Sequence, residues 1–291
     1  MVASPIRVSA PAKVNLYLGV GARRPDGFHD VTTVLQSLEL ADEVTLEPDA
    51  PFSVVCEPAL GIPAEENIVA RAARELASRA GREPAGRFVI AKQLPAGGGL
   101  GGGSADAAAA LRALCEAWGI EPADVRVTEA ARAVGADVPF FLVGGAALFV
   151  GRGDVLARRL RSLETDVVLV NPGPPVPTPA AYAAFDRLLS PAPPAVEPLL
   201  RMLEDGLVPQ SLYNGLAEAA ARVVPEIADV LGYLRVAPGV TAAQVAGSGS
   251  TVFGLCEDAA AAGEAADRAR ERGWWAAATR TTDAGAVLLG S

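Results

Sequence analysis

The segment Pro95-Ala96-Gly97-Gly98-Gly99-Leu100-Gly101-Gly102-Gly103-Ser104 decides the fold class. A helical pattern follows it at once, because apolar residues over 111–118 recur at the spacing of one helix face. Glycines let backbone N–H groups converge on a phosphate, and the start of the next helix adds partial positive charge. The loop therefore predicts an anion site for a nucleoside triphosphate. We expect nucleotide contacts from Pro95, Gly97, Gly98, Gly99, Leu100, Gly101, Gly102, Gly103 and Ser104.

Two familiar phosphate loops do not fit this segment. A Walker A loop needs Gly-Lys-Ser/Thr, whereas Ser104-Ala105-Asp106 follows the glycines here. A dinucleotide fingerprint belongs to a first βαβ unit, but this loop lies a third of the way along the chain. A flexible linker would not run straight into a well-phased helix. A dinucleotide oxidoreductase is therefore the weaker alternative.

Strand and helix patterns alternate on both sides of the loop. We expect strands over 14–20, 31–40, 44–46, 53–56, 88–94, 146–150, 167–170, 251–256 and 274–279. We expect helices over 67–79, from about 104, over 124–134, from 178 with further helices to about 234, and over 259–272. A charged stretch follows Gly151-Arg152-Gly153-Asp154 and predicts a boundary, with one domain over 1–160 and a second over 161–291. The expected fold class is α+β with two domains.

Composition limits the function. The 291 residues include 25 Lys and Arg against 34 Asp and Glu, and a net charge of −9 argues against sequence-independent nucleic-acid binding. A hydrophobic content of 51% excludes disorder. Three widely spaced cysteines and a single histidine, His29, argue against a zinc site and favour a reducing compartment. The sequence shows neither a secretory leader nor a membrane span, so we expect a cytoplasmic protein without membrane partners.

Lys13 and Lys92 are the only lysines in a chain that otherwise uses arginine. They mark positions where a compact ammonium is not replaceable by a guanidinium. Taken alone, Lys13 could equally be a solvated residue at the start of a strand, and Lys92 an exposed strand residue. Asp137 alone would be interpreted as a helix cap.

The loop over 95–105, together with Gly247-Ser248-Gly249-Ser250-Thr251-Val252-Phe253, resembles the two glycine motifs of the GHMP kinase superfamily. Segments 11–16, 24–29 and 135–139 resemble the branch that phosphorylates a cytidyl diphosphate ester of methylerythritol. The similarity runs from about residue 9 to about residue 285. It implies a two-domain α+β GHMP architecture with the active site in the cleft between domains.

The resemblance also implies roles. It implies ATP-dependent phosphorylation of the 2-hydroxyl of that ester, in the non-mevalonate route to isoprenoid precursors, with ATP and Mg²⁺ as cofactors. Asp137 would be the general base and Lys13 its partner, and a positioned base is what proton removal from an alcohol requires. Asn67 and Lys92 would lie beside the nucleotide, although Asn67 is equally an N-cap. Ser104 would cap its helix and reach a phosphate or Mg²⁺, while Asp106 would stabilise the helix start.

The same resemblance assigns the acceptor side. Phe28 offers a ring for stacking on a pyrimidine, His29 its hydrogen bonds, and Tyr182 a second ring. Asn15 shares a strand face with Lys13, and Thr178 would cap its helix, with Pro179 at the first helical position, and touch the acceptor. The remaining substrate-binding candidates are Asp137, Gly247 and Ser248. Two alternatives stay open: another GHMP kinase, for homoserine or a sugar, and a non-catalytic nucleotide-binding sensor.

Overall fold

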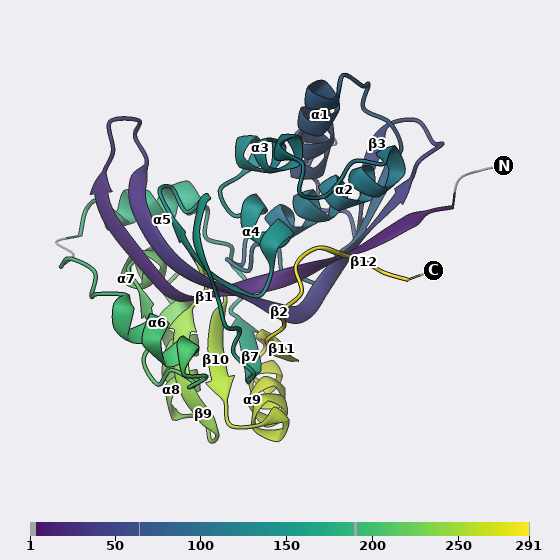
Figure 1. Cartoon of the computed structure of the whole chain (residues 1–291). Helices are drawn as coiled ribbons and strands as arrows, with labels where there is room; N and C mark the ends of the chain where they lie inside the picture. The colour runs from purple at the N-terminus through teal and green to yellow at the C-terminus, as the bar shows by residue number, and fades with distance from the viewer. Residues whose placement is uncertain (1–3, 64, 189–190, 291) are drawn as a thin grey trace.

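The computed structural model describes residues 4–63, 65–188 and 191–290, which form two β-sheets with helices packed on them (Figure 1). The larger sheet contains β1 (Ile6–Arg23), β2 (His29–Glu47), β3 (Ser53–Glu57), β4 (Arg87–Ala91), β5 (Ala146–Val150), β6 (Val155–Leu160), β8 (Tyr213–Asn214) and β12 (Val287–Leu288). The smaller sheet contains β7 (Asp166–Asn171), β9 (Val240–Val245), β10 (Val252–Cys256) and β11 (Trp275–Arg280). The helices are α1 (Ile68–Ala80), α2 (Gly102–Trp118), α3 (Val125–Val134), α4 (Val138–Val143), α5 (Thr178–Phe185), α6 (Glu197–Glu204), α7 (Ala217–Val223), α8 (Glu226–Val236) and α9 (Ala259–Glu271).

The larger sheet has the order β12-β1-β2-β4-β3, with β5 and then β6 beside β2, and β8 beside β1. The smaller sheet is antiparallel, in the order β11-β7-β10-β9. The α+β class is therefore confirmed. The boundary near residue 160 stays a prediction, because β8 and β12 follow it in the sequence yet pair with β1. None of the helices in the described ranges is long and apolar enough to cross a bilayer.

Strands β1 and β2 form one long antiparallel hairpin that projects past α5 (Figure 1). The sequence predicts three shorter strands here, because irregularities in the pairing interrupt the alternation of polar and apolar residues. One irregularity lies between Pro11 and Lys13. Before it, Val8 and Ala10 pack with the helical layer, whereas after it Val14 and Leu16 pack toward the smaller sheet. The change of face turns Lys13 toward the cavity described below.

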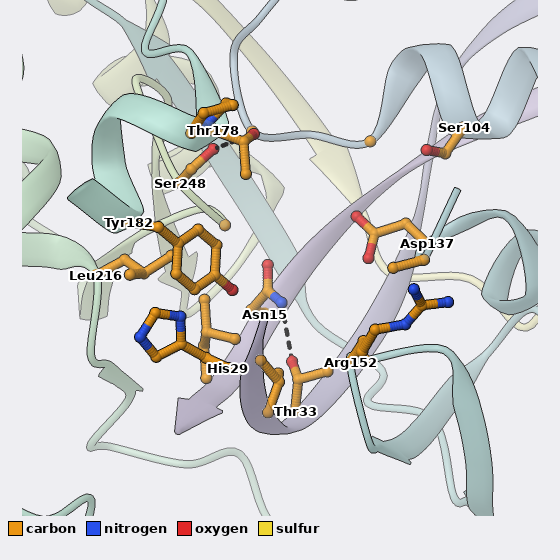
Figure 2. A pocket seen from close by; sticks show the side chains of 18 of the residues that line it. Asn15, His29, Thr33, Ser104, Asp137, Arg152, Thr178, Tyr182, Leu216 and Ser248 are labelled. Carbon is orange, nitrogen blue, oxygen red and sulfur yellow. Dashed lines mark hydrogen bonds between the residues drawn. The ribbon is translucent and has the colours of Figure 1, made fainter. Parts of the chain in front are cut away.

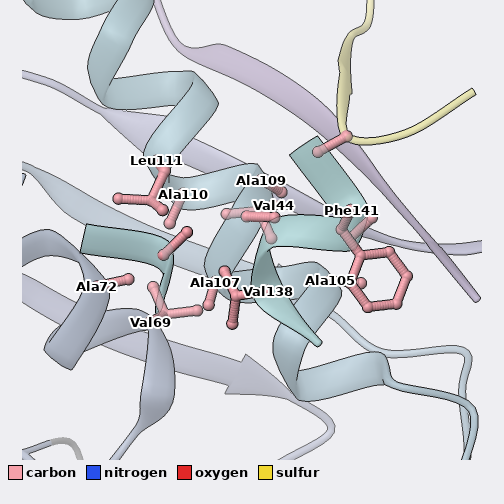
Figure 3. Packing of buried hydrophobic residues seen from close by; sticks show 14 of the residues in the cluster. Val44, Val69, Ala72, Ala105, Ala107, Ala109, Ala110, Leu111, Val138 and Phe141 are labelled. Atoms are coloured by element: carbon pink, nitrogen blue, oxygen red, sulfur yellow. The ribbon is translucent and has the colours of Figure 1, made fainter. Parts of the chain in front are cut away.

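Helices α1 to α4 cover one face of the larger sheet, with α2 at the centre (Figure 1). From Ala105 to Leu111 every residue of α2 is buried, and most are alanine. These small side chains let α1 and α4 approach closely, so Val69, Val138 and Phe141 pack directly on the helix (Figure 3). This packing fixes the start of α2, which carries the glycine-rich loop.

Both faces of the smaller sheet are covered by other parts of the chain. Val168 and Val170 of β7 face α8 and α9, whereas Val167 and Leu169 join a cluster with residues of β1. Each of these four side chains is fully buried, and each contributes roughly 1.5–3 kcal/mol by leaving water. A continuous apolar core therefore joins the two sheets.

Two predicted helix caps are wrong. Helix α2 begins at Gly102 with Gly101 at its N-cap, so Ser104 lies within the first turn. Helix α5 begins at Thr178 with Pro177 at its N-cap. Neither cap residue has a side chain that can bond a helical N–H group, so the first N–H groups of α2 remain available for a ligand.

Candidate active site

A cavity of about 730 Å³ opens where β1, the hairpin tip, the glycine-rich loop and the starts of α4 and α5 meet (Figure 2). It brings together the predicted residues Lys13, Asn15, Phe28, His29, Gly97, Gly99, Gly101, Gly102, Gly103, Ser104, Asp137, Thr178, Tyr182, Gly247 and Ser248. The predicted residues outside its lining are Asn67, Lys92, Pro95, Gly98 and Leu100. Most of the candidates that the sequence singles out therefore share one cavity.

Lys13 and Asp137 form the charged pair of this cavity. The Lys13 side chain is 4% exposed, and its Nζ lies 3.5 Å from Asp137 Oδ2. Asp137 occupies the N-cap position of α4, but its side chain makes no capping hydrogen bond and remains 35% exposed. The carboxylate is thus free to meet a ligand in the cavity.

A chain of hydrogen bonds orients the ammonium. Lys13 Nζ donates to Asn15 Oδ1 at 2.9 Å. Asn15 Nδ2 donates to Thr33 Oγ1 at 2.9 Å (Figure 2). Thr33 Oγ1 in turn donates to the carbonyl oxygen of Tyr17 at 2.8 Å. Because the threonine hydroxyl uses its proton on that carbonyl, it can only accept from Asn15. The carbonyl side of Asn15 is therefore fixed toward Lys13. Thr33 was not predicted from the sequence, because its partners lie on another strand.

The glycine-rich loop is held from two sides. The backbone N–H of Lys13 donates to Leu100 O at 3.0 Å, and that of Thr251 donates to Gly98 O at 3.0 Å. Gly99 has a φ of +81°, and a side chain there would overlap the backbone of Ala246. At Gly247 a Cβ would lie 3.0 Å from Lys13 Nζ. Glycine at both positions lets the loop, the ammonium and the C-terminal turn approach one another.

The side chain of Asn214 fixes that C-terminal turn. Its Nδ2 donates to the carbonyl oxygens of Val245 and Gly247, both at 2.8 Å. Within this turn, the hydroxyl group of Ser248 lies 3.1 Å from that of Thr178 (Figure 2). Thr178, which does not cap its helix, thus contacts the turn at the edge of the cavity.

Aromatic side chains line the other end of the cavity. The rings of His29 and Tyr182 stack with centroids 5.2 Å apart and planes 22° apart (Figure 2). Phe185 meets the His29 ring edge-on. Burial, with the nearby charge of Asp137, raises the pKa of Tyr182 to about 12, so its hydroxyl keeps its proton. Phe28 lies outside this stack, 54% exposed, with the guanidinium of Arg152 5.0 Å from its ring centroid.

Two further charged residues at this end of the cavity were not predicted from the sequence. Asp186 Oδ1 lies 2.8 Å from His29 Nε2, and both Asp186 and Arg152 line the cavity. Asp186, the C-cap residue of α5, follows Tyr182 by four positions, and this helical spacing places the two side chains on one face. That spacing was the available signal for Asp186. Nothing in the sequence pointed to Arg152, which reaches Phe28 from the turn after β5.

Lys92 is buried beneath the loop rather than exposed on its strand. Its Nζ donates to Asp42 and, at 2.7 Å, to Asp106. Burial opposes the charge of Lys92, but the two carboxylates outweigh this effect and raise its pKa. Burial also raises the pKa of Asp106 to about 7 against the attraction of Lys92. Asp106 therefore serves this ion cluster, whereas the sequence predicted a role at the helix start.

Asp42 supports the start of the loop, and Asn67 supports the start of α1. Asp42 Oδ1 accepts the backbone N–H groups of Gln93 at 2.6 Å and Leu94 at 2.9 Å, just before the loop begins. Asn67 caps α1 by accepting from the N–H of Val69 at 2.9 Å. Contact of Asn67 or Lys92 with a nucleotide stays a prediction.

Comparison with known protein families identifies the class. Residues 67–145 match the GHMP kinases N terminal domain, and residues 191–273 match the GHMP kinases C terminal domain. The chain therefore belongs to the GHMP kinase family, whose members are small-molecule kinases.

Individual relatives narrow the comparison. A protein of Xanthobacter autotrophicus is 41% identical over 93% of this chain and 97% of its own length, and one of Streptomyces coelicolor is 42% identical over 92% and 93%. Both are named 4-diphosphocytidyl-2-C-methyl-D-erythritol kinase. A crystal structure of 4-(cytidine 5'-diphospho)-2C-methyl-D-erythritol kinase superposes with a TM-score of 0.78 at 36% identity, covering 98% of this chain and all of that one. Homoserine kinase from Cytophaga hutchinsonii, at 18% identity and a TM-score of 0.73 over 99% and 98% of the two chains, shares the fold.

Proposed function

We propose that this kinase transfers the γ-phosphoryl group of ATP to the 2-hydroxyl of 4-diphosphocytidyl-2-C-methyl-D-erythritol. The products would be ADP and the 2-phosphate. The observation that carries the proposal is the division of one cavity into two ends (Figure 2). Asp137 and Ser104 lie at one end beside the loop, and the stacked rings of His29 and Tyr182 lie at the other. An acceptor with an alcohol at one end and a pyrimidine at the other matches this division.

The charged pair supplies the chemistry that phosphoryl transfer to an alcohol needs. The carboxylate of Asp137 would accept the hydroxyl proton as the oxygen attacks phosphorus. The ammonium of Lys13, already bonded to Asn15, would stabilise negative charge on the transferred group without reorganising. Because Lys13 is nearly buried, its charge is weakly screened by water.

The glycine-rich loop would hold the triphosphate. Its backbone N–H groups and the uncapped start of α2 offer hydrogen bonds and partial positive charge to the phosphate oxygens. Arg23 and Arg152 also line the cavity and add positive charge for the diphosphate of the acceptor. These groups form a local positive site in a chain whose net charge is −9.

Mg²⁺ fits this arrangement as an ion carried mainly by the nucleotide. Within the described ranges no group of three or more His, Cys, Asp or Glu side chains could hold a metal ion. Mg²⁺ in kinases commonly uses one or two protein oxygens and several phosphate oxygens. The Ser104 hydroxyl, which lies beside the loop, is an oxygen that the cavity offers to such an ion. When bound, the ion would neutralise charge on the phosphates.

The two alternatives explain less of the cavity. Homoserine or a simple sugar carries no base and leaves the stack of His29 and Tyr182 without a role. A sensor that only binds nucleotide would not need the ion pair of Lys13 and Asp137. The names of the relatives also favour the cytidyl acceptor.

The test is a panel of acceptors with ATP and Mg²⁺. ADP release should depend on the cytidyl ester, and homoserine or galactose should give only the background of Asp137→Asn protein assayed in parallel. Equal turnover with homoserine, or no turnover with any alcohol, would refute the proposal.

A further inference from the structure

The single histidine of the chain is bonded to a carboxylate behind it. His29 Nε2 lies 2.8 Å from Asp186 Oδ1, and the imidazole side chain is 6% exposed whereas that of Asp186 is 38% exposed. An ionised carboxylate only accepts hydrogen bonds, so Nε2 must carry the proton of this bond. In the neutral ring the other nitrogen, Nδ1, is then an acceptor.

The other imidazole nitrogen of His29, Nδ1, is available to a ligand. Within residues 4–63, 65–188 and 191–290, no hydrogen bond involves Nδ1, and the buried polar side-chain atoms without a partner are Ser37 Oγ and Asp106 Oδ1. Nδ1 is therefore neither bonded nor sealed off, and His29 lines the cavity. Tyr182 and Phe185 pack on the ring, so the ring cannot rotate freely to exchange its two nitrogens.

We propose that Asp186 is a positioning residue that selects cytosine over uracil by fixing the protonation of His29. Cytosine presents an amino group, a donor, where uracil presents a carbonyl oxygen, an acceptor. An Nδ1 lone pair accepts from the cytosine amino group but repels the uracil oxygen. The selection therefore has an attractive and a repulsive part, and both depend on the proton that Asp186 holds on Nε2. This inference rests on the proposed function, because a cytidyl acceptor must place its base at this end of the cavity.

Nuclear magnetic resonance of protein labelled with ¹⁵N-histidine tests the first step without any substrate. The chain has one histidine, so the spectrum needs no assignment. Recorded well above the ordinary imidazole pKa of about 6.5, the wild type should show Nε2–H and unprotonated Nδ1. In Asp186→Leu the Nδ1–H form should become populated. A wild-type spectrum dominated by Nδ1–H would overturn the inference.

The second step is measured as the ratio of kcat/KM for the cytidyl ester to that for its uridyl counterpart. Asp186→Leu should lower this ratio about tenfold, which is the worth of one hydrogen bond. In a His29→Ala background the same substitution should leave the ratio unchanged, because the residue through which Asp186 acts is gone. An unaltered ratio in Asp186→Leu, or an equal loss in the His29→Ala background, contradicts the inference.

Asp30→Leu is the matched control. Asp30 lies on the same hairpin beside His29, pairs with Arg24 and is 65% exposed. Asp30→Leu removes one negative charge near His29, as Asp186→Leu does, but leaves the hydrogen bond between His29 and Asp186 intact. The histidine spectrum and the ratio of kcat/KM values should therefore both match the wild type. If neither ester is phosphorylated, the proposed function fails, and the ratio is then measured from the binding of cytidine and uridine 5'-diphosphate. Equal binding of the two by the wild type would overturn the inference as well.

Discussion

Lys13 Nζ lies 3.5 Å from Asp137 Oδ2, although Lys13 projects from the middle of a buried strand and Asp137 from the start of a short helix. The pair joins a nearly buried cation to a partly exposed anion. The cation is therefore held rigidly, while the anion stays within reach of a ligand. This asymmetry suits a base that must accept a proton beside a fixed positive charge.

Asp137→Asn should lower kcat by about 10²–10⁴-fold, because the amide cannot accept the hydroxyl proton. The side chain makes no capping hydrogen bond, so the fold should survive the change. ATP affinity, measured by calorimetry, should stay close to that of the wild type, since the loop would supply the phosphate contacts. Unchanged turnover would show that another group accepts the proton.

Lys13→Met should keep the fold but lower kcat by about 10²–10³-fold, the usual effect of removing one electrostatic group from a transition state. Lys13→Arg should not restore activity. Asn15 Oδ1 lies 2.9 Å from Nζ, and a Cβ at Gly247 would lie 3.0 Å from it, so the pocket around the ammonium has no room for a guanidinium. Steady-state kinetics of the two variants, with circular dichroism to verify folding, distinguish the cases. Wild-type activity in Lys13→Arg would mean that charge alone matters.

Tyr182→Ala should raise the KM for the cytidyl ester more than Phe28→Ala does. Tyr182 is part of the stack with His29, whereas Phe28 is 54% exposed at the hairpin tip. Loss of a stacking ring costs about 1–3 kcal/mol, so we expect a rise of about 5- to 150-fold for Tyr182→Ala. The KM for ATP should change little in both variants. A larger effect of Phe28→Ala on the ester would move the base site to the hairpin tip.

The cluster of Lys92, Asp42 and Asp106 predicts a pH-dependent stability. The pKa of Asp106 rises from its ordinary 3.8 to about 7 in the folded chain, chiefly through burial. Between these values the native state binds more protons than the unfolded state, so the free energy of unfolding should fall as pH rises through this window. Asp106→Asn removes the titrating group and should flatten the fall, measured by urea unfolding at several pH values. An equally steep fall in Asp106→Asn would assign the effect to other groups.

Lys92→Met removes the cation of the same cluster, whereas Asp106→Asn removes one of its carboxylates. It leaves the carboxylates of Asp42 and Asp106 buried together without a cation. Removing one partner of a buried ion pair typically costs 3–5 kcal/mol. We therefore expect a loss of about this size at pH 8, and wild-type stability would show that the cluster is solvated.

The sequence predicted the parts of the site that are local in the chain. The glycine-rich loop and the helix after it are contiguous, so spacing alone revealed them. The partners of Lys92 were missed because Asp42 lies on β2, far away in the sequence, and only the pairing of β2 with β4 brings them together. Thr33 was missed for the same reason, since it meets Asn15 across two strands.

The sequence also did not predict the full lengths of β1 and β2. Alternation of polar and apolar residues predicts a strand only while one face stays buried. In β1 all residues from Pro11 to Val20 are buried, and the irregular pairing exchanges the two faces. Strands β8 and β12 have two residues each and carry no periodic signal. Ser104 and Thr178 were predicted as caps, but the N-caps are Gly101 and Pro177, and both hydroxyl groups are left for other partners.

The glycine-rich loop is tied by Leu100 to the backbone of β1 and by Gly98 to the backbone of Thr251. A swing of one half of the molecule away from the other would have to break both ties and open the shared apolar core. The route by which ligands come and go is therefore expected at the end of the β1–β2 hairpin, which lines the cavity and projects past α5 (Figure 1). Access to the cavity would then depend on the end of this hairpin, and a hinge between the two halves would contribute little.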